Sequence, residues 1–242
     1  MRDAYYLMCA RSLGILALLL VALVSTGCAF PQDPRETLEQ VQSGTMRIGI
    51  AENEPWARME NGEPSGVEAE LLRNFAEELG SEPEFFRGTV PELLEAIKQG
   101  ELDVVIGGLT RSTPALMQEA GVTNSYLKTH LVVGVPPSEE TFDDLSGREV
   151  AVEHIGRTAA HLKEKGAIPV QVSDLSTADR PVAAYDWQLE EWGFESTGIR
   201  LPEEQHVMAV PRGENGWLVR LEHFLSSQRD EAQRLLREEA SG

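Results

Sequence analysis

The feature that most constrains this chain is a repeated alternation of short apolar strands with amphipathic helices, which begins at Met46. Apolar side chains recur at a spacing of two in the strand patterns and at helical spacing in the helix patterns. Gly80 and Gly100 stand directly after the two helix patterns, where helices commonly end. Successive strand–helix units favour an α/β fold with right-handed crossovers. In this part of the chain we expect elements at residues 46–51, 67–79, 83–86, 91–99 and 102–107.

A second series of short strands and helices follows the apolar segment 128–135. The pattern predicts two α/β lobes, each a small mostly parallel sheet flanked by helices, joined by two crossover strands near 128–135 and 204–211. We assign residues 46–129 and 207–242 to lobe 1 and residues 130–206 to lobe 2. The further elements expected are residues 149–152, 156–165, 169–172, 182–185, 186–192, 206–211, 217–224 and 229–238.

Residues 1–27 have the features of a signal peptide. Arg2 and Arg11 flank a short polar start, and an uninterrupted run of apolar or small residues follows over 13–24. This run is too short to span a bilayer, for which about 20 residues are needed. An N-terminal anchor that is never cut is the alternative interpretation of the segment.

A possible lipidation site follows the apolar run. Residues 24–28 read Val-Ser-Thr-Gly-Cys and resemble the bacterial lipobox, in which the cysteine carries the lipid, except that Ser25 stands where an aliphatic residue is usual. We predict a lipid anchor on Cys28 and a tether over residues 28–45. A secreted protein in which Cys28 is incidental is the other interpretation.

The sequence is strongly acidic, with a formal net charge of −19. Residues 1–27 carry Arg2, Asp3 and Arg11, a net charge of +1, so their removal would leave −20. We therefore exclude nucleic acid as a partner, because it requires a basic face. An anionic membrane surface is disfavoured for the same reason, although a covalent lipid overrides the repulsion. Cys9 would leave with the signal peptide, so the mature chain is expected to have no internal disulfide and no cysteine-based zinc site.

Several blocks of the first half follow one another in the order and spacing of a known family. The blocks are Met46-Arg-Ile-Gly-Ile, Pro55-Trp56, Gly66-Val-Glu-Ala-Glu-Leu71, Gly100-Glu-Leu-Asp-Val-Val-Ile-Gly-Gly108 and Leu109-Thr110. Over roughly residues 46–239 this succession resembles solute-binding protein family 3, the amino-acid-type extracytoplasmic receptors of ABC importers. The resemblance implies a periplasmic-binding-protein-like fold whose two lobes close on a small polar solute. It also implies a helix between residues 172 and 182, where this chain has only a short polar stretch, so lobe 2 is expected to be one helix short.

The resemblance implies ligand contacts from lobe 1. Trp56 matches the aromatic residue that covers the ligand, although a tryptophan packed at the base of a loop gives the same pattern. Gly108 and Thr110 match the segment that presents backbone N–H groups and a hydroxyl to the ligand carboxylate. The family's carboxylate-binding arginine is absent from the matching stretch, residues 112–117. Arg111 is either the replacement for that charge or a solvent-facing arginine.

Two positions of lobe 2 complete the implied site. Gly156-Arg157-Thr158-Ala159 resembles a Gly-Thr-Thr turn whose free N–H groups hold an anion at the start of a helix, with Thr158 as the contact. Asp186 matches the aspartate that faces the α-amino group of the ligand. Both positions are also compatible with an ordinary helix start.

Three histidines, His130, His154 and His206, fall at strand ends near the expected hinge or cleft, with Glu153 beside them. No short ligand-spacing motif links them. We therefore predict no metal site, and we expect no cofactor.

The leading hypothesis is a non-enzymatic, lipid-anchored receptor, extracytoplasmic in the periplasm or at the cell surface. It would deliver a small zwitterionic or cationic, amino-acid-like solute to an ABC transporter permease. The first alternative is an enzyme, because the same fold is used by a periplasmic cyclohexadienyl dehydratase and is appended to peptidoglycan lyases; Glu68, Glu153 or a cleft histidine would then be the general acid. The second alternative is a binding protein that signals to a sensor partner.

Overall fold

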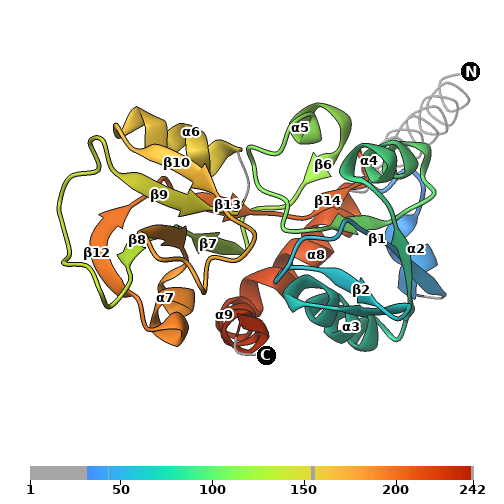
Figure 1. Cartoon of the computed structure of the whole chain (residues 1–242). Coiled ribbons are helices and arrows are strands. Elements are labelled where there is room, and N and C mark those ends of the chain that lie inside the picture. Colours follow the sequence, from blue (N-terminus) through green and yellow to red (C-terminus); the bar gives the residue numbers. More distant parts are fainter. Residues whose placement is uncertain (1–31, 43, 154–155, 241–242) are drawn as a thin grey trace, which may run out of the picture. The chain divides into compact units, whose positions relative to one another are not determined.

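Two five-stranded sheets organise residues 32–42, 44–153 and 156–240, which are the residues that this computed structural model describes (Figure 1). The first sheet has the strand order β4 (Glu82–Arg87), β1 (Thr45–Ile50), β5 (Val104–Ile106), β14 (Ala209–Val210), β6 (Gly121–Val122). The second has the order β10 (Ile168–Gln171), β9 (Glu149–Val152), β11 (Val182–Ala184), β8 (Val132–Val135), β12 (Glu195–Arg200). We call the first sheet with its helices lobe 1 and the second sheet with its helices lobe 2.

Each sheet is half parallel and half antiparallel. Strand β1 is parallel to β4 and β5, whereas β14 is antiparallel to β5 and β6. Strand β9 is parallel to β10 and β11, whereas β8 is antiparallel to β11 and β12. The parallel halves arise from the βα units, and β8 and β14 are the strands on which the chain enters one lobe and returns to the other. The predicted two-lobed fold is confirmed, with sheets less parallel than the strand–helix alternation alone indicated.

The helices lie close to their predicted ranges. Lobe 1 carries α2 (Thr37–Gln42), α3 (Val67–Leu79), α4 (Val90–Gln99), α5 (Leu116–Glu119) and α8 (Asn215–Ser227), followed by α9 (Arg229–Ala240). Lobe 2 carries α6 (Arg157–Glu164) and α7 (Asp186–Trp192). Gly80 and Gly100 adopt the left-handed conformation after α3 and α4, with φ of 67° and 80°, as their positions in the sequence indicated. No helix occurs within residues 172–181, which are all described, so lobe 2 lacks the helix that the resemblance implies.

A two-stranded ribbon connects the lobes. Strand β7 (Leu127–Thr129) pairs antiparallel with β13 (Glu204–His206), and Thr129 lies opposite Glu204. The expected single strand over 128–135 is therefore two strands, β7 and β8, because the chain leaves the ribbon to join the second sheet. The boundaries given above for the two lobes stay a prediction.

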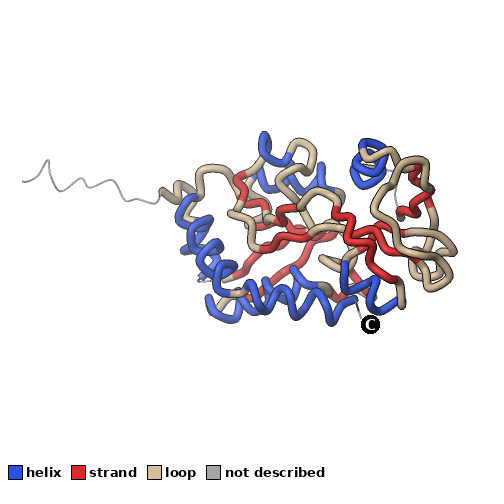
Figure 2. Tube along the Cα trace, turned by 90° about the vertical axis from the view of Figure 1, so that its left-hand side faces the viewer, coloured by secondary structure: helices blue, strands red, loops and turns tan. Residues whose placement is uncertain are grey.

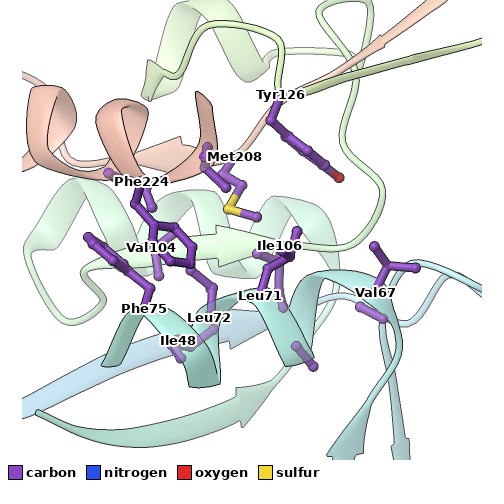
Figure 3. Packing of buried hydrophobic residues seen from close by; sticks show 14 of the residues in the cluster. Ile48, Val67, Leu71, Leu72, Phe75, Val104, Ile106, Tyr126, Met208 and Phe224 are labelled. Atoms are coloured by element: carbon purple, nitrogen blue, oxygen red, sulfur yellow. The ribbon is translucent and has the colours of Figure 1, made fainter. Parts of the chain in front are cut away.

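The largest core lies in lobe 1. The apolar face of α3 packs on the first sheet through Leu71, Leu72 and Phe75, and Phe224 of α8 joins the same cluster (Figure 3). Lobe 2 has two smaller clusters, around Val133 and around Val132. Figure 2 shows the strands in the interior and helices along the outside. The two remaining strands form a hairpin beside α3: β2 (Arg58–Glu60) and β3 (Glu63–Ser65).

The predicted N-terminal segments lie mostly outside the described residues. The predicted signal peptide and Cys28 lie outside the described residues. His154, farther along the chain, also lies outside them. Within the predicted tether, residues 37–42 form α2, and Val41 is buried in the core of lobe 1. In the described part of the chain, no helix combines the length and the apolar character that a membrane span requires.

Candidate functional site: a cleft between the lobes

A cavity of about 390 Å³, which we call the cleft, is lined by residues of both lobes and of strand β13. Its aromatic lining residues are Trp56, Tyr185, Trp192 and His206. Its carboxylate lining residues are Glu54, Glu153, Asp174 and Glu204. Among the described residues, Arg157 is the only lysine or arginine in the lining. The cleft therefore combines aromatic faces with an excess of negative charge, which suits a small molecule that carries a positive group.

Glu68 of α3 holds the turn by which lobe 1 reaches the cleft. Its side chain is fully buried, and its Oε2 accepts hydrogen bonds from the backbone N–H groups of Gly107 (2.7 Å) and Gly108 (2.8 Å). Its Oε1 accepts a hydrogen bond of 2.7 Å from the hydroxyl of Tyr126, a residue of the cluster in Figure 3. Burial raises the pKa of Glu68 to about 7, and the three hydrogen bonds oppose that shift. Glu68 therefore fixes the backbone at Gly108 without reaching the cleft itself.

Two glycines make room for Trp56. Gly66 has φ of 100°, and a Cβ atom there would lie 2.7 Å from the carbonyl oxygen of Trp56. Gly108 has φ of 63°, and a Cβ atom there would lie 2.5 Å from Cδ1 of Trp56 and from Nδ2 of Asn53. Any other residue would combine backbone strain with a steric clash at both positions. The position of Trp56 therefore explains why glycines occur at positions 66 and 108.

Trp56 is buried and stacks on His206 of β13. The ring centroids are 3.7 Å apart, and the side chain of Trp56 is 3% exposed. Nε2 of His206 shares a hydrogen bond of 2.8 Å with the hydroxyl of Thr129, whereas Nδ1 has no partner in the described part of the chain. Burial lowers the pKa of His206 to about 3, so the imidazole is neutral at physiological pH. A neutral imidazole leaves the negative charge of the cleft uncompensated, and it is a poor general acid.

Tyr185 of lobe 2 lines the cleft next to Trp56. Burial raises its pKa to about 12, the nearby Glu204 acts in the same direction, and hydrogen bonds with the side chains of Thr129 and Trp56 oppose the shift. The phenol is therefore neutral and serves as a hydrogen-bonding group. Its ring also stacks on that of Trp187, with centroids 4.3 Å apart.

Arg157, in the first turn of α6, makes a polar contact between the lobes. One terminal N–H group donates to the backbone oxygen of Ser112 in lobe 1 at 2.8 Å, and the other donates to the hydroxyl of the same serine. No ion pair joins Arg157 to a described carboxylate. The guanidinium group thus lines the cleft, and no carboxylate in the described part of the chain neutralises its charge.

The residues expected from the sequence divide into two groups. Trp56, Gly108 and Thr158 line the cleft together, and Thr158 is half-buried there. Thr110 and Arg111 are not part of its lining. Arg111 is exposed, and within the described ranges its guanidinium group makes only a long contact of 3.4 Å with the backbone oxygen of Thr123.

The groups of lobe 1 that were expected to hold a ligand carboxylate already have partners within the lobe. The N–H of Gly108 donates to Glu68, and the N–H of Thr110 donates to the hydroxyl of Thr113 at 2.9 Å. The hydroxyl of Thr110 lies 3.0 Å from that of Ser112. An incoming anion would have to break these bonds, so these three groups are not free to bind it in the present structure.

Asp186 lies outside the cleft. It is exposed and lines a separate pocket of about 220 Å³ near His130, whose Nε2 is 3.8 Å from its Oδ2. Ala183 of β11 and Tyr185, which caps α7, line the cleft, whereas Asp186, the first residue of α7, does not. The expected pairing of Trp56 with Asp186 on one ligand therefore has no geometric basis here.

Arg157, Glu204 and Tyr185 are among the cleft residues that the sequence did not single out as ligand contacts. Arg157 lies in the turn that resembles the family's anion-binding turn, but Thr158 beside it was the residue proposed as the ligand contact. Tyr185 could have been predicted from the alternation of side chains along the expected strand 182–185. Glu204 becomes a cleft residue only through the pairing of β13 with β7, which no local pattern reveals.

The described residues contain no group of three or more histidine, cysteine, aspartate or glutamate side chains with the geometry of a metal site. His130 lines the pocket near Asp186 and His206 stacks on Trp56, whereas His154 is not among the described residues.

Comparison with known proteins adds a family and a set of relatives. A model of the bacterial extracellular solute-binding proteins, family 3, matches residues 46–236. The membrane-bound lytic murein transglycosylase F of Vibrio cholerae is 33% identical over 123 residues, which is 50% of this chain and 22% of that protein. The chain thus spans about a fifth of the length of this curated relative.

The solved structures that resemble this chain share its fold at low sequence identity. An ancestral cationic amino acid solute binding protein, AncCDT-1, has a TM-score of 0.65 and 18% identity, covering 84% of this chain and 98% of its own. The L-cystine solute receptor of Neisseria gonorrhoeae, in its unliganded open conformation, has a TM-score of 0.67 and 16% identity, covering 85% and 99%. These similarities extend over both lobes, in agreement with the predicted fold.

The comparisons overturn one expectation. From its sequence we expected a non-enzymatic protein, yet relatives that match this sequence are named as lytic transglycosylases, and AncCDT-1 is described as a precursor of cyclohexadienyl dehydratase. That expectation rested on the sequence, which contains no Gly-x-Ser-x-Gly elbow, no phosphate loop and no zinc-ligand motif. Their absence does not exclude catalysis, because a general acid in a closed cleft needs no sequence motif.

Proposed function

Because this chain belongs to the bacterial extracellular solute-binding proteins of family 3, we propose that it is an extracytoplasmic receptor for a small zwitterionic or cationic, amino-acid-like solute bound in the cleft. The observation that carries the proposal is the composition of the cleft wall, in which carboxylates and aromatic rings surround a single arginine. Carboxylates attract an ammonium group, and aromatic faces add apolar contact and cation–π attraction.

Glu204 is the carboxylate best suited to meet the ammonium group. It is half-buried on β13, it lines the cleft, and its charge acts on the neighbouring Tyr185. No lysine or arginine among the described residues forms an ion pair with it. A half-buried, unpaired carboxylate gains most from a ligand that brings the missing positive charge.

The lobes would close on the solute because both contribute contacts. Trp56 belongs to lobe 1, Tyr185 and Thr158 belong to lobe 2, and Glu204 belongs to the ribbon between them. A ligand that touches all three parts stabilises only the arrangement in which they face one another. Two proteins of the same fold are described as a cationic amino acid solute binding protein and as an L-cystine solute receptor in an unliganded open conformation, and both descriptions support a solute-binding role.

The finer parts of the proposal concern anchoring and delivery. We propose that Cys28 carries a lipid that holds the protein at a bacterial membrane, and that the solute passes to an ABC transporter permease. Mass spectrometry of the native protein is expected to find a chain that begins at a lipid-modified Cys28. A different mature N-terminus, or a Cys28→Ser variant that stays membrane-bound, would contradict the anchor without affecting the cleft.

A ligand screen tests the proposed function. We expect at least one neutral or basic amino acid to raise the melting temperature of the mature protein and to bind in calorimetry, and we expect aspartate and glutamate to do neither. The acidic wall is the reason for this order. A screen in which no amino acid, amine or osmolyte stabilises the protein would count against a receptor of this class.

An enzyme acting on a small ligand in the same cleft is the second candidate, favoured by the names of the relatives and by Glu153. Glu153 lines the cleft and has no ion-pair partner among the described residues, so it is available as a general acid. Glu68 is not, since its oxygens are occupied and it does not line the cleft. Assays of prephenate and arogenate turnover test this candidate, with Glu153→Gln expected to abolish any activity found.

A further inference from the structure

The position of Arg157 is informative because it combines cleft exposure with contact to the opposite lobe. It is the second residue of the Gly156-Arg157-Thr158 turn, and all three residues line the cleft. Its contact with Ser112 holds the guanidinium group across the cleft, at the stretch of lobe 1 that contains no arginine of its own over residues 112–117.

Its hydrogen-bonding capacity is only partly used. Each terminal nitrogen donates once, to the hydroxyl or to the backbone oxygen of Ser112. No further donor of the group, Nε–H included, has a partner in the described part of the chain. A guanidinium group offers its donors as a planar fork that matches a carboxylate in two parallel bonds.

The charges of the cleft do not neutralise one another. Glu153 and Glu204 share the cleft with Arg157, and neither is ion-paired with it. Arg157 and Glu153 are exposed and Glu204 is half-buried, so water solvates these charges in the ligand-free protein without an ion pair between them. Charges kept apart are complementary to a ligand that carries both signs at a matching separation.

We infer that Arg157 is the residue that binds the carboxylate of the solute, so that the anion subsite belongs to lobe 2 and the ligand is a zwitterion. This inference rests on the proposed function and narrows it. The carboxylate takes the free donors of Arg157 while the ammonium group faces the acidic wall. An amine without a carboxylate leaves Arg157 unmatched and binds more weakly. Arg157 is thus the residue that determines specificity between amino acids and amines.

The test compares each of the twenty L-amino acids with its carboxamide, which keeps the ammonium group and lacks the negative charge. Calorimetry of the wild-type mature protein is expected to find an amino acid that binds at least about 30-fold more tightly than its amide. Arg157→Gln should weaken that amino acid by about 30- to 100-fold and leave the amide within about threefold. Arg200→Gln, which removes an exposed charge from the same lobe, is the matched control and should change neither.

Several outcomes would overturn the inference while the receptor role stands. These are equal binding of acid and amide by the wild type, equal weakening of both by Arg157→Gln, or loss of acid binding in Arg111→Gln in place of Arg157→Gln. Melting curves of each variant separate a binding defect from a folding defect. If the wild type binds no amino acid and no amide, the proposed function fails and the inference fails with it.

Discussion

At the cleft, lobe 1 and lobe 2 differ in how far their polar groups are already satisfied. In lobe 1, the N–H of Gly108 donates to Glu68, and the polar groups of Thr110 bond within their own loop. In lobe 2 and the ribbon, Arg157 and Glu204 face the cleft without ion-pair partners among the described residues. These polar groups of lobe 1 are thus bonded within the lobe, whereas Arg157 of lobe 2 and Glu204 of the ribbon are available to a charged ligand.

The hydrophobic core of lobe 1 is also larger than the cores of lobe 2. Phe75, Trp217 and Phe224 pack together in the core of lobe 1, with Phe75 and Phe224 centroids 4.6 Å apart. The two clusters of lobe 2 are smaller, and no helix covers residues 172–181. The comparison teaches that the two lobes contribute differently to the cleft: lobe 1 holds Trp56 in a densely packed setting, and lobe 2 with the ribbon contributes Arg157 and Glu204.

The largest effect is expected on the stability of lobe 1, when the buried hydrogen bonds of Glu68 are removed. Glu68→Ala leaves three buried donors without an acceptor and opens a cavity, so we expect it to lower the free energy of unfolding by about 3–5 kcal/mol. Glu70→Ala in the same helix, which removes a partly exposed carboxylate paired with Arg73, should cost less than about 1 kcal/mol. Urea denaturation of both variants measures the difference. Equal losses would mean that Glu68 does not hold lobe 1 together.

The pH dependence of stability gives a second test of lobe 1. The pKa of Glu68 is raised from 4.5 to about 7, so the folded protein binds the proton more tightly than the unfolded chain does. Stability from this group is fully present below pH 4.5 and is lost as the pH rises to about 7, by at most about 3.5 kcal/mol. Glu68→Gln keeps a hydrogen-bonding side chain and removes the titration.

The measured quantity is the difference in unfolding free energy between Glu68→Gln and the wild type across this pH range. This difference cancels the contribution of His206, whose pKa is lowered to about 3 and whose stabilisation is lost as the pH falls from 6.5. We expect the difference to rise with pH in favour of the glutamine variant. A flat difference would show that Glu68 titrates near its ordinary pKa.

A smaller effect is expected on ligand affinity when the carboxylate of Glu204 is removed from the ribbon. With the tightest-binding amino acid of the screen, Glu204→Ala should weaken binding by about 10- to 100-fold, because the ammonium group loses its half-buried partner. Asp186→Ala, which removes a carboxylate outside the cleft, should change the affinity by less than about threefold. Calorimetry decides between them, and the reverse order would return the ammonium site to Asp186.

The smallest effect is expected on the stability of the ligand-free protein when a lobe 2 charge is removed. Arg157→Gln breaks only the exposed contact with Ser112, so the unfolding free energy should change by less than about 0.5 kcal/mol. Thermal and urea unfolding of the free protein measure it. A loss comparable to that of Glu68→Ala would mean that the two lobes do not differ as described.

Local pattern was sufficient for most of the fold. The apolar spacing and terminal glycines of α3 and α4 predicted both helices within a residue, because these signals act within one or two turns. The absence of a helix between 172 and 182 was also readable, since too few residues separate the two strands. The family followed from the order of several short blocks, which the match over residues 46–236 supports.

The cleft itself was decided by tertiary structure. A carboxylate at position 68, an arginine at 157 and a glutamate at 204 are ordinary surface residues as far as local pattern shows. The packing of α3 buries the first, the turn into α6 carries the second to Ser112 of the other lobe, and pairing of β13 with β7 brings the third into the cleft. Asp186 was assigned to the site by sequence position, and a one-residue step past Tyr185 put it on another face. The sequence by itself determined the elements and the family because their signals are local and periodic. Which side chains meet depends on strand pairing and on lobe contacts between residues far apart in the chain, and only the tertiary structure decided those.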